Sequence, residues 1–434
     1  MYENGSEFSQ VLEDVQTYPQ TYPPKVQIHV FIFYNPYSGN RQGMQMKNYA
    51  EQFVRLKKYE TVQVQMYDLT DCDDCNKGFA YLKTLTTAST TSPTTTSTTL
   101  IPDFLICSAG GDGSFVGVIH KMIECDISPT WNNIYFTAFP FGTGNDLSQS
   151  LGWKRFIPYK QTHTFDGFSE HLIARLEKLD VMKRTGITNM DIWNVTVSPR
   201  NGGYVEKATR KLPARVTEKT SRLMSNYVVF GVQGIVGTGF ESGRKHSRFM
   251  NVIEYTRHTF WRGVINHVER VPEYIHSIKN RGTTYYLDTN RKSCRRMVEI
   301  VFQNLPGIWG RRMRLWDICK PSHTVVQPVK NGTDSNTWDV SKVHDGKLDV
   351  YGIKSRTDYL LKQLKCYSSM SNICRIGQLS EQVIIKCVPK TTFHMMLDGE
   401  FYTLYDIDTI SIDVVAKVKI VRGDDIQEVI SRGD

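Results

Sequence analysis

The chain has 434 residues, of which 40% are hydrophobic and 22% are charged, a composition typical of a folded protein of two domains. Its formal net charge of +9 is modest for this length, which favours an anionic membrane surface or a nucleotide as partner over dedicated nucleic-acid binding. The 9 cysteines are odd in number and follow no repeating framework, so we expect reduced thiols in an intracellular compartment.

The beginning of the chain does not have the pattern of a secretory signal. Residues 1–24 are expected to be a disordered tail, because Met1 to Gln20 is polar and acidic and lacks the basic start and apolar core of a secretory signal. No stretch reaches the roughly 18 apolar residues that a membrane span requires. We therefore expect a cytoplasmic protein, and if its substrate is a lipid, the protein must work from the membrane surface by peripheral association.

The first elements alternate between strands and helices. Gln27 to Tyr34 is rich in β-branched and aromatic residues and predicts a buried strand that ends at the turn Asn35-Pro36. A helix is expected from Met44 to Lys58, then a strand from Val62 to Tyr67 and a weaker helix from Gly78 to Leu85. This alternation indicates a parallel α/β sheet.

Two compositions stand out around this second helix. Residues 86–99 are almost entirely Thr and Ser, which predicts a disordered surface insertion, because such a segment cannot bury a core. Cys72 and Cys75 have the spacing of a metal-binding pair, but a zinc site needs two further ligands that no nearby pair supplies. We interpret the segment around these cysteines as an acidic loop.

Two glycine-rich loops follow the next two predicted strands. The first, Gly110-Gly111-Asp112-Gly113-Ser114, follows the apolar run Phe104 to Cys107, and the second, Phe141-Gly142-Thr143-Gly144-Asn145-Asp146, follows Ile134 to Phe139. Glycines at such turns bring bare N–H groups against a polyanion, and the helix that follows adds its positive end. The apolar spacing from Phe115 to Ile123 predicts that helix, which places Asp112 at a strand-to-helix corner. A nucleotide is the expected ligand.

The second half of the chain predicts a mostly β domain. Its strand-like runs are Ile192–Val197, Tyr227–Val232, Thr284–Leu287, Val298–Phe302, Leu348–Ile353, Gln382–Cys387 and Ile410–Val421. One exception, Phe249 to Ile275, is expected to be a helix that packs on the sheet, with a membrane-facing role as the weaker option.

Taken in order, these motifs resemble the diacylglycerol kinase family. The resemblance rests on Asn35-Pro36-Tyr37-Ser38-Gly39, the two glycine loops and the late Leu397-Asp398-Gly399-Glu400, and it extends from about Val26 to Val421. Stretches similar to the eukaryotic branch are Met190–Val195, Pro306–Gly310 and Asp345–Val350. Ser114 stands where the family usually has Thr, and these 434 residues contain no cysteine-rich zinc module of the animal members.

The resemblance implies an α/β + β architecture. A Rossmann-like α/β nucleotide-binding domain, the diacylglycerol kinase catalytic domain, is expected over residues 25–165, a β-sandwich accessory domain over residues 180–421, and a C-terminal tail over residues 422–434. The implied activity is transfer of the γ-phosphate of ATP, with Mg²⁺, to the hydroxyl of diacylglycerol, which gives phosphatidic acid.

The candidate site residues fall into three groups. Asp112 and Asp398 are the two candidate catalytic bases, and Asp112 is also the candidate Mg²⁺ ligand. Glu400 is expected to contact Mg²⁺ or the ribose. The other candidate nucleotide-binding residues are Asn35, Ser38, Gly39, Gly110, Gly111, Gly113, Ser114, Gly142, Thr143, Gly144 and Asn145. Structural alternatives remain open: a strand-exit turn for Asn35, a helix cap for Asp146 and a hairpin turn for Asp398.

Other functions compete with this reading. A sphingoid-base or ceramide kinase would use the same loops, and a non-catalytic lipid-binding homologue would keep the fold without turnover. Phosphofructokinases and NAD kinases also have GGDG-type loops. A phosphofructokinase is disfavoured, because the Thr-Ile-Asp-Asn-Asp segment that it would need is absent and because of the second glycine loop and the β-rich second half. Nucleic acid is not an expected partner, and the oligomeric state stays open. The basic clusters Arg291-Lys292, Arg295-Arg296 and Arg311-Arg312 with Arg314 are a hypothetical contact for anionic headgroups.

Overall fold

The computed structural model describes residues 28–39, 41–49, 53–56, 59–91, 102–209, 214–243, 257–258, 268–287, 296–307, 314–318, 339–359 and 373–423. The chain divides into two compact units, the first made of Met1–Met190 with Lys417–Asp434 and the second of Asp191–Ala416. The predicted tail over residues 1–24 lies outside the described residues. The first unit thus takes in C-terminal residues that the sequence had assigned to the β domain.

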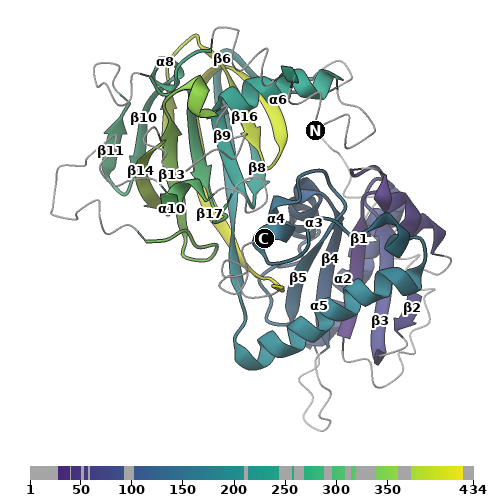
Figure 1. The fold of residues 1–434 in the computed structure, drawn as a ribbon. Helices are drawn as coiled ribbons and strands as arrows, with labels where there is room; N and C mark the ends of the chain where they lie inside the picture. Colours follow the sequence, from purple (N-terminus) through teal and green to yellow (C-terminus); the bar gives the residue numbers. More distant parts are fainter. Residues whose placement is uncertain are drawn as a thin grey trace. The chain divides into compact units, whose positions relative to one another are not determined.

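The first unit is built on a five-stranded sheet in the order β2-β3-β1-β4-β5 (Figure 1). Strands β1 (Ile28–Tyr34), β3 (Tyr59–Asp68), β4 (Asp103–Gly110) and β5 (Ile134–Pro140) run parallel, and β2 (Phe53–Leu56) is an antiparallel edge strand. From β1 the chain continues to β3 on one side and later to β4 on the other. The topological switch point therefore lies between β1 and β4, where open α/β sheets bind ligands beyond the carboxyl ends of their strands.

Helices cover both faces of this sheet. On one face, α2 (Cys72–Thr91) and α3 (Asp112–Glu124) pack their aromatic residues onto the strands: Phe79 stacks on Phe33 with ring centroids 4.1 Å apart, and Phe115 meets Phe136 edge-on. On the other face, Phe168 of α5 (Phe165–Thr185) contacts Phe139. The shorter helices of the unit are η2 (Gln42–Asn48), α4 (Asp146–Ser150) and η3 (Tyr159–Thr162). The predicted parallel α/β sheet is confirmed.

The helix predicted from Met44 to Lys58 is wrong. The segment forms the 3-10 helix η2 and then strand β2, in which Val54 lies opposite Val64 of β3. Pairing with an existing strand satisfies the backbone groups of β2, and such tertiary context outweighs a local helical pattern.

The Thr/Ser-rich segment is not wholly an insertion outside secondary structure. Helix α2 continues to Thr91, and Thr86 is buried with its hydroxyl donating to the Leu82 carbonyl oxygen at 2.8 Å. A hydroxyl that bonds the carbonyl four residues earlier is satisfied inside the helix, so a Thr-rich composition does not end it here. Cys72 and Cys75 lie in the first turn of α2 and not in a loop. Residues 92–101 of the predicted insertion lie outside the described residues.

The second unit is a large antiparallel sheet, with β11-β10-β15-β17-β16-β9-β12-β13-β14 as its main order and β6 paired to β17, β7 and β8. The strands are β6 (Asn189–Lys207), β7 (Arg215–Val216), β8 (Thr220–Met224), β9 (Tyr227–Gly231), β10 (Ile275–Asn280), β11 (Thr283–Tyr286), β12 (Glu299–Gln303), β13 (Lys347–Ile353), β14 (Ile373–Ser380), β15 (Val383–Cys387), β16 (Thr392–Leu397) and β17 (Glu400–Lys419). Their alternating apolar side chains form one core that includes Phe230, Ile300, Leu348 and Phe393. The mostly β character predicted for this half is confirmed.

Short helices pack on the opposite side of these strands. Val236 of α6 (Val232–Gly243) and Trp316 of α10 (Leu315–Ile318) belong to a second apolar cluster with Tyr351. The helix predicted over residues 249–275 lies mostly outside the described residues, and the described part ends in the four-residue helix α8 (Val271–Tyr274). Of the basic clusters, only Arg296 and Arg314 are described. Within the described ranges, no helix has the length and apolar character needed to cross a bilayer.

Candidate nucleotide site

The site begins where β1 and β4 end side by side. The Asn35 N–H donates to the Ala109 carbonyl at 2.9 Å, and the Asn35 side chain accepts a hydrogen bond from the Tyr37 N–H at 2.9 Å. Asn35 therefore forms the strand-exit turn that was one of its two interpretations, and Gly39 adopts a φ of 56° within the same loop. This turn places the loop at the switch point of the sheet.

Ser38, Gly110 and Ser114 lie together at this point. A Cβ built on Gly110 would come within 2.2 Å of the Ser114 Oγ and 3.4 Å of the Ser38 Oγ. Glycine is thus the residue that leaves room for two hydroxyl groups beside a bare backbone. Hydroxyls and exposed N–H groups are the donors that a phosphate group needs.

The two glycine loops pack against each other through their backbones. The N–H groups of Phe141 and Gly142 both donate to the Gly110 carbonyl, at 3.0 and 2.9 Å. A Cβ on Gly142 would lie 2.5 Å from the Gly111 Cα, which is closer than a side-chain atom can approach a backbone atom. The loops that follow β4 and β5 therefore form one connected surface.

Asp112 links these loops by its carboxylate. Its Oδ2 accepts from the Asp146 N–H at 2.9 Å and its Oδ1 from the Leu147 N–H at 3.2 Å, so Asp112 caps α4 from 34 residues away. The half-buried side chain is held with its charge at the start of both α3 and α4, where the helix dipoles stabilise an anion. Sequence reasoning proposed Asp146 itself as the cap of α4, and nothing local indicated a cap supplied by Asp112.

Within the second loop, Asn145 and Thr143 differ in their surroundings. Asn145 is buried with a φ of 56°, and its amide donates to the carbonyls of Gly142 and Arg155, both at 2.9 Å. Asn145 thus braces the loop from inside. The Thr143 Oγ1 is buried and has no hydrogen-bond partner among the described residues.

Asp398 belongs to the second unit and lies in the turn between β16 and β17. Its carboxylate accepts four hydrogen bonds, from the N–H groups of Ser225, Asn226 and Tyr227 and from the Ser225 hydroxyl. Burial raises the pKa of Asp398 to about 6, against these hydrogen bonds, which lower it. That value would suit a general base, but four donors occupy the acceptor positions of both oxygens. The geometry matches the hairpin-turn interpretation, with Asp398 at a φ of 46°.

Both carboxylate oxygens of Glu400, next to this turn, also accept hydrogen bonds. Its two oxygens accept from the Lys207 ammonium and the Tyr402 hydroxyl, each at 2.6 Å. Burial alone would raise the pKa of Glu400, but the charge of Lys207 and these hydrogen bonds outweigh it and lower the pKa. Glu400 is therefore an ionised group that already has a cation beside it.

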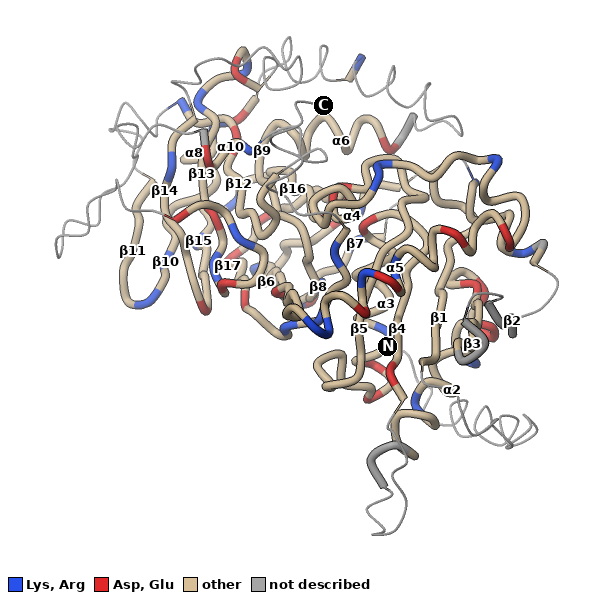
Figure 2. Tube along the Cα trace, turned by 60° about the horizontal axis from the view of Figure 1, so that its bottom comes forward, with Lys and Arg blue, Asp and Glu red and all other residues tan. Residues whose placement is uncertain are grey.

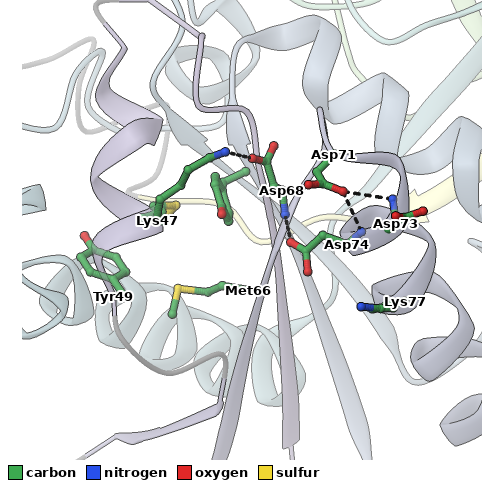
Figure 3. Close-up of a pocket in the computed structure, with 10 residues that line it drawn as sticks. Lys47, Tyr49, Met66, Asp68, Asp71, Asp73, Asp74 and Lys77 are labelled. Carbon is green, nitrogen blue, oxygen red and sulfur yellow. Dashed lines mark hydrogen bonds and ion pairs between the residues drawn. The ribbon is translucent and has the colours of Figure 1, made fainter. Parts of the chain in front are cut away.

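A pocket that sequence reasoning missed lies within the first unit. It has a volume of about 520 Å³ and is shown in Figure 3. Its lining residues are Tyr34, Met46, Lys47, Tyr49, Met66, Asp68, Asp71, Asp73, Asp74 and Lys77. Figure 2 shows the acidic residues gathered where β3 ends. The run of Asp residues after Tyr67 is the signal in the sequence that could have indicated this pocket, but a strand end followed by an acidic loop accounts for the same pattern.

Asp68 and Lys47 form an ion pair in this pocket. The Lys47 Nζ lies 2.6 Å from the Asp68 Oδ2, and the carboxylate side chain is only 4% exposed. Burial alone would raise the pKa of Asp68, but Lys47 and hydrogen bonds from Thr70 outweigh burial and lower it. Asp68 is thus a buried and ionised carboxylate at the carboxyl end of a strand.

Comparisons with known proteins agree with this architecture. The diacylglycerol kinase catalytic domain matches residues 29–172, and the diacylglycerol kinase accessory domain matches residues 223–401. A solved structure from Bacillus anthracis aligns over 91% of this chain and 97% of its own, at 13% identity and a TM-score of 0.45.

Curated relatives include the eye-specific diacylglycerol kinase of Drosophila melanogaster, 21% identical over 86% of this chain and 21% of that protein. Diacylglycerol kinase 4 of Arabidopsis thaliana is 24% identical over 52% of this chain and 46% of its own length. Human diacylglycerol kinase theta is 23% identical over 58% of this chain and 23% of its own length. This chain thus spans less than half the length of these relatives. With both domain types matched in order along it, the chain belongs to the diacylglycerol kinase family.

Proposed function

We propose that this chain is an ATP-dependent lipid kinase that phosphorylates diacylglycerol to phosphatidic acid. The observation that carries the proposal is the Asp112 carboxylate, which the N–H groups of Asp146 and Leu147 hold between two glycine loops at the switch point of the sheet. That edge is where α/β sheets bind nucleotides. Membership of the diacylglycerol kinase family supplies the reaction class.

In this proposal the first unit is a Rossmann-like domain that binds the phosphates of ATP. Ser38, Ser114 and Thr143 supply hydroxyl groups, and the glycines of both loops supply backbone N–H groups. Mg²⁺ would neutralise part of the charge of the phosphates. Asp112 fits this ion, because Mg²⁺ is usually bound by one or two protein carboxylates together with phosphate oxygens. In the residues described, no three acidic, His or Cys side chains are grouped as metal ligands, so phosphate oxygens and water would complete the coordination.

Asp112 is the proposed general base. The lipid hydroxyl oxygen forms a bond to the γ-phosphorus, the bond from that phosphorus to the bridging oxygen of ADP breaks, and the hydroxyl proton passes to the Asp112 carboxylate. The preference for Asp112 over Asp398 rests on the four donors that already bind the Asp398 carboxylate. A positioned base typically contributes about 10²- to 10⁴-fold in rate.

Because diacylglycerol resides in a bilayer, we further propose that the protein acts as a peripheral protein at a cytoplasmic membrane surface. The second unit, which we propose to be the β-sandwich accessory domain, carries Asp398 and Glu400. Within that unit, Glu400 is paired with Lys207.

The test is transfer of labelled phosphate from ATP and Mg²⁺ to diacylglycerol, sphingosine and ceramide in mixed micelles. We expect labelled phosphatidic acid, and little label on the two sphingoid lipids. If a sphingoid lipid is labelled instead, the proposed substrate is wrong and the proposed mechanism is kept. No transfer to any lipid would favour the non-catalytic lipid-binding alternative.

A further inference from the structure

The segment that follows β17 packs on the first unit. Residues 420–423, at the yellow end of the ribbon in Figure 1, form what we call the return segment. Ile420 forms a parallel bridge with Phe136 of β5, and the Val421 N–H donates to the Phe136 carbonyl at 2.8 Å. Ile420 and Val421 are fully buried. The return segment is therefore fixed to the strand that leads into the second glycine loop.

The return segment also holds the end of α4. The Gly423 N–H donates at 2.8 Å to the carbonyl of Leu151, the C-cap residue of α4. A Cβ on Gly423 would lie 2.5 Å from the Gly152 carbonyl oxygen, so this close approach requires glycine. Trp153 adds a second connection, because its Nε1–H donates to the Val421 carbonyl at 3.1 Å. Two hydrogen bonds thus join the residues at the end of α4 to the return segment.

A buried arginine orients Trp153 for this contact. The Arg175 guanidinium lies 4.4 Å from the centroid of the Trp153 ring and 4.0 Å from the centroid of the Phe139 ring. Its Nη2 donates to the Ala138 carbonyl at 2.9 Å, and Arg175 is only 3% exposed. A cation over aromatic rings in a desolvated place is a favourable contact. Trp153 is therefore held against β5, and its N–H group is directed in advance at the return segment.

The position of α4 depends on the contacts at its two ends. The helix has only 5 residues, and so short a helix is not stable on its own. At its first turn, the N–H groups of Asp146 and Leu147 bond the Asp112 carboxylate. At its other end, the return segment bonds Leu151. Because a single turn of helix separates these contacts, a shift at one end moves the other.

We propose that the return segment positions the Asp112 carboxylate through α4, with Gly423 and Trp153 as positioning residues. A misplacement of about 1 Å in a reacting group can lower a rate about 100-fold, so the position of α4 matters for transfer. The inference rests on the proposed function, because it takes Asp112 as the base. It adds residues from the far end of the chain to the set on which the reaction depends.

Hydrogen–deuterium exchange of α4, followed by mass spectrometry, tests the coupling without any substrate. In Gly423→Ala, the new methyl group has no room beside the Gly152 carbonyl oxygen, so the return segment moves away from α4. We expect the amides of α4, which include the two that bond Asp112, to exchange about 5- to 10-fold faster, while those of β1 keep the wild-type rate. Trp153→Phe keeps a ring beside Arg175 and removes the N–H donor, so it should speed exchange by a smaller factor.

Lys419→Met is the matched control. The Lys419 Nζ donates to the Asn132 carbonyl at 2.8 Å and so anchors the chain directly before the return segment. Asn132 precedes β5, whereas α4 follows it, so this anchor lies at the opposite end of the strand. The variant is expected to keep wild-type exchange in α4 and wild-type kcat, even if its unfolding temperature falls as much as that of Gly423→Ala.

Steady-state kinetics test whether the coupling serves the reaction. For phosphatidic acid formation, we expect kcat of Gly423→Ala to fall about 10- to 100-fold. ADP affinity measured without Mg²⁺ should stay close to wild type, because Asn145 braces the second glycine loop separately. A role in stability alone would not separate kcat from affinity in this way.

Three results would overturn the inference. They are wild-type exchange of α4 in both Gly423→Ala and Trp153→Phe, wild-type kcat in a variant whose α4 exchanges faster, and equal losses of kcat in Lys419→Met. If the wild-type protein phosphorylates no lipid, the proposed function is wrong. Exchange of α4 then still decides whether the return segment holds Asp112, with faster exchange in Gly423→Ala supporting the coupling and wild-type exchange refuting it.

Discussion

At the scale of single residues, the donors around a carboxylate decide what it can do. Asp112, the first residue of α3, accepts hydrogen bonds from the Asp146 and Leu147 N–H groups at the start of α4, whereas Asp398 is bonded by four donors in a buried turn. The sequence presents both as an Asp next to a glycine. Their difference arises from donors at residues 225–227 and 146–147, far away along the chain, and so no local pattern could reveal it.

Replacing Asp398 by Asn is expected to destabilise the protein. One oxygen becomes an NH₂ group, which cannot accept from the N–H groups that bond this side chain, and leaving a buried donor unpaired costs about 1–3 kcal/mol. We expect the free energy of unfolding in urea to fall by about that amount. In the control, Asp126→Asn, the change removes an exposed carboxylate at a φ of 56° that Asn tolerates, and stability stays close to wild type. Unchanged stability of Asp398→Asn would contradict the structural role.

At the scale of elements, the sequence predicted most of the strands of the first unit and the helix after the first glycine loop. Those segments have strong apolar patterns, and β1, β4 and β5 end at a Gly or Pro or within two residues of one. The helix predicted from Met44 to Lys58 is wrong because the second half of this segment becomes a strand only by pairing with β3. Helix α2 extends through Thr residues for a related reason, since the Thr86 hydroxyl finds its acceptor inside the helix.

The contact between the glycine loops can be tested at Gly142. In Gly142→Ala, the new Cβ would meet the Gly111 Cα at 2.5 Å, and overpacking of this kind costs typically about 1–3 kcal/mol. We expect a lower unfolding temperature. Gly117→Ala is the matched control, because Gly117 lies inside α3 with nothing within 4 Å of its Cβ position. That substitution should stabilise by about 0.5–1 kcal/mol. Equal effects of the two substitutions would show that the loops can move apart at no cost.

At the scale of the whole molecule, the order of a nucleotide-binding half and a β-rich half was predictable, but the extent of each was not. The first unit includes the end of the chain, where the Val421 N–H donates to the Phe136 carbonyl at 2.8 Å and the Gly423 N–H to the Leu151 carbonyl at 2.8 Å. The sequence-based boundary placed Val421 in the β domain and Gly423 in a tail. Backbone hydrogen bonds between residues so far apart in the chain leave no periodic pattern in the sequence from which they could be predicted.

The central claim is that the chain transfers phosphate to diacylglycerol with Asp112 as the base. The most direct measurement is formation of phosphatidic acid by Asp112→Asn and Asp398→Asn, each normalised to its folded fraction and paired with ADP affinity from calorimetry. We predict that Asp112→Asn loses about 10²- to 10⁴-fold in kcat while ADP affinity measured without Mg²⁺ changes little, and that Asp398→Asn keeps most of its kcat once its lower stability is taken into account. Wild-type kcat in Asp112→Asn, or its loss in Asp398→Asn alone, would contradict the account.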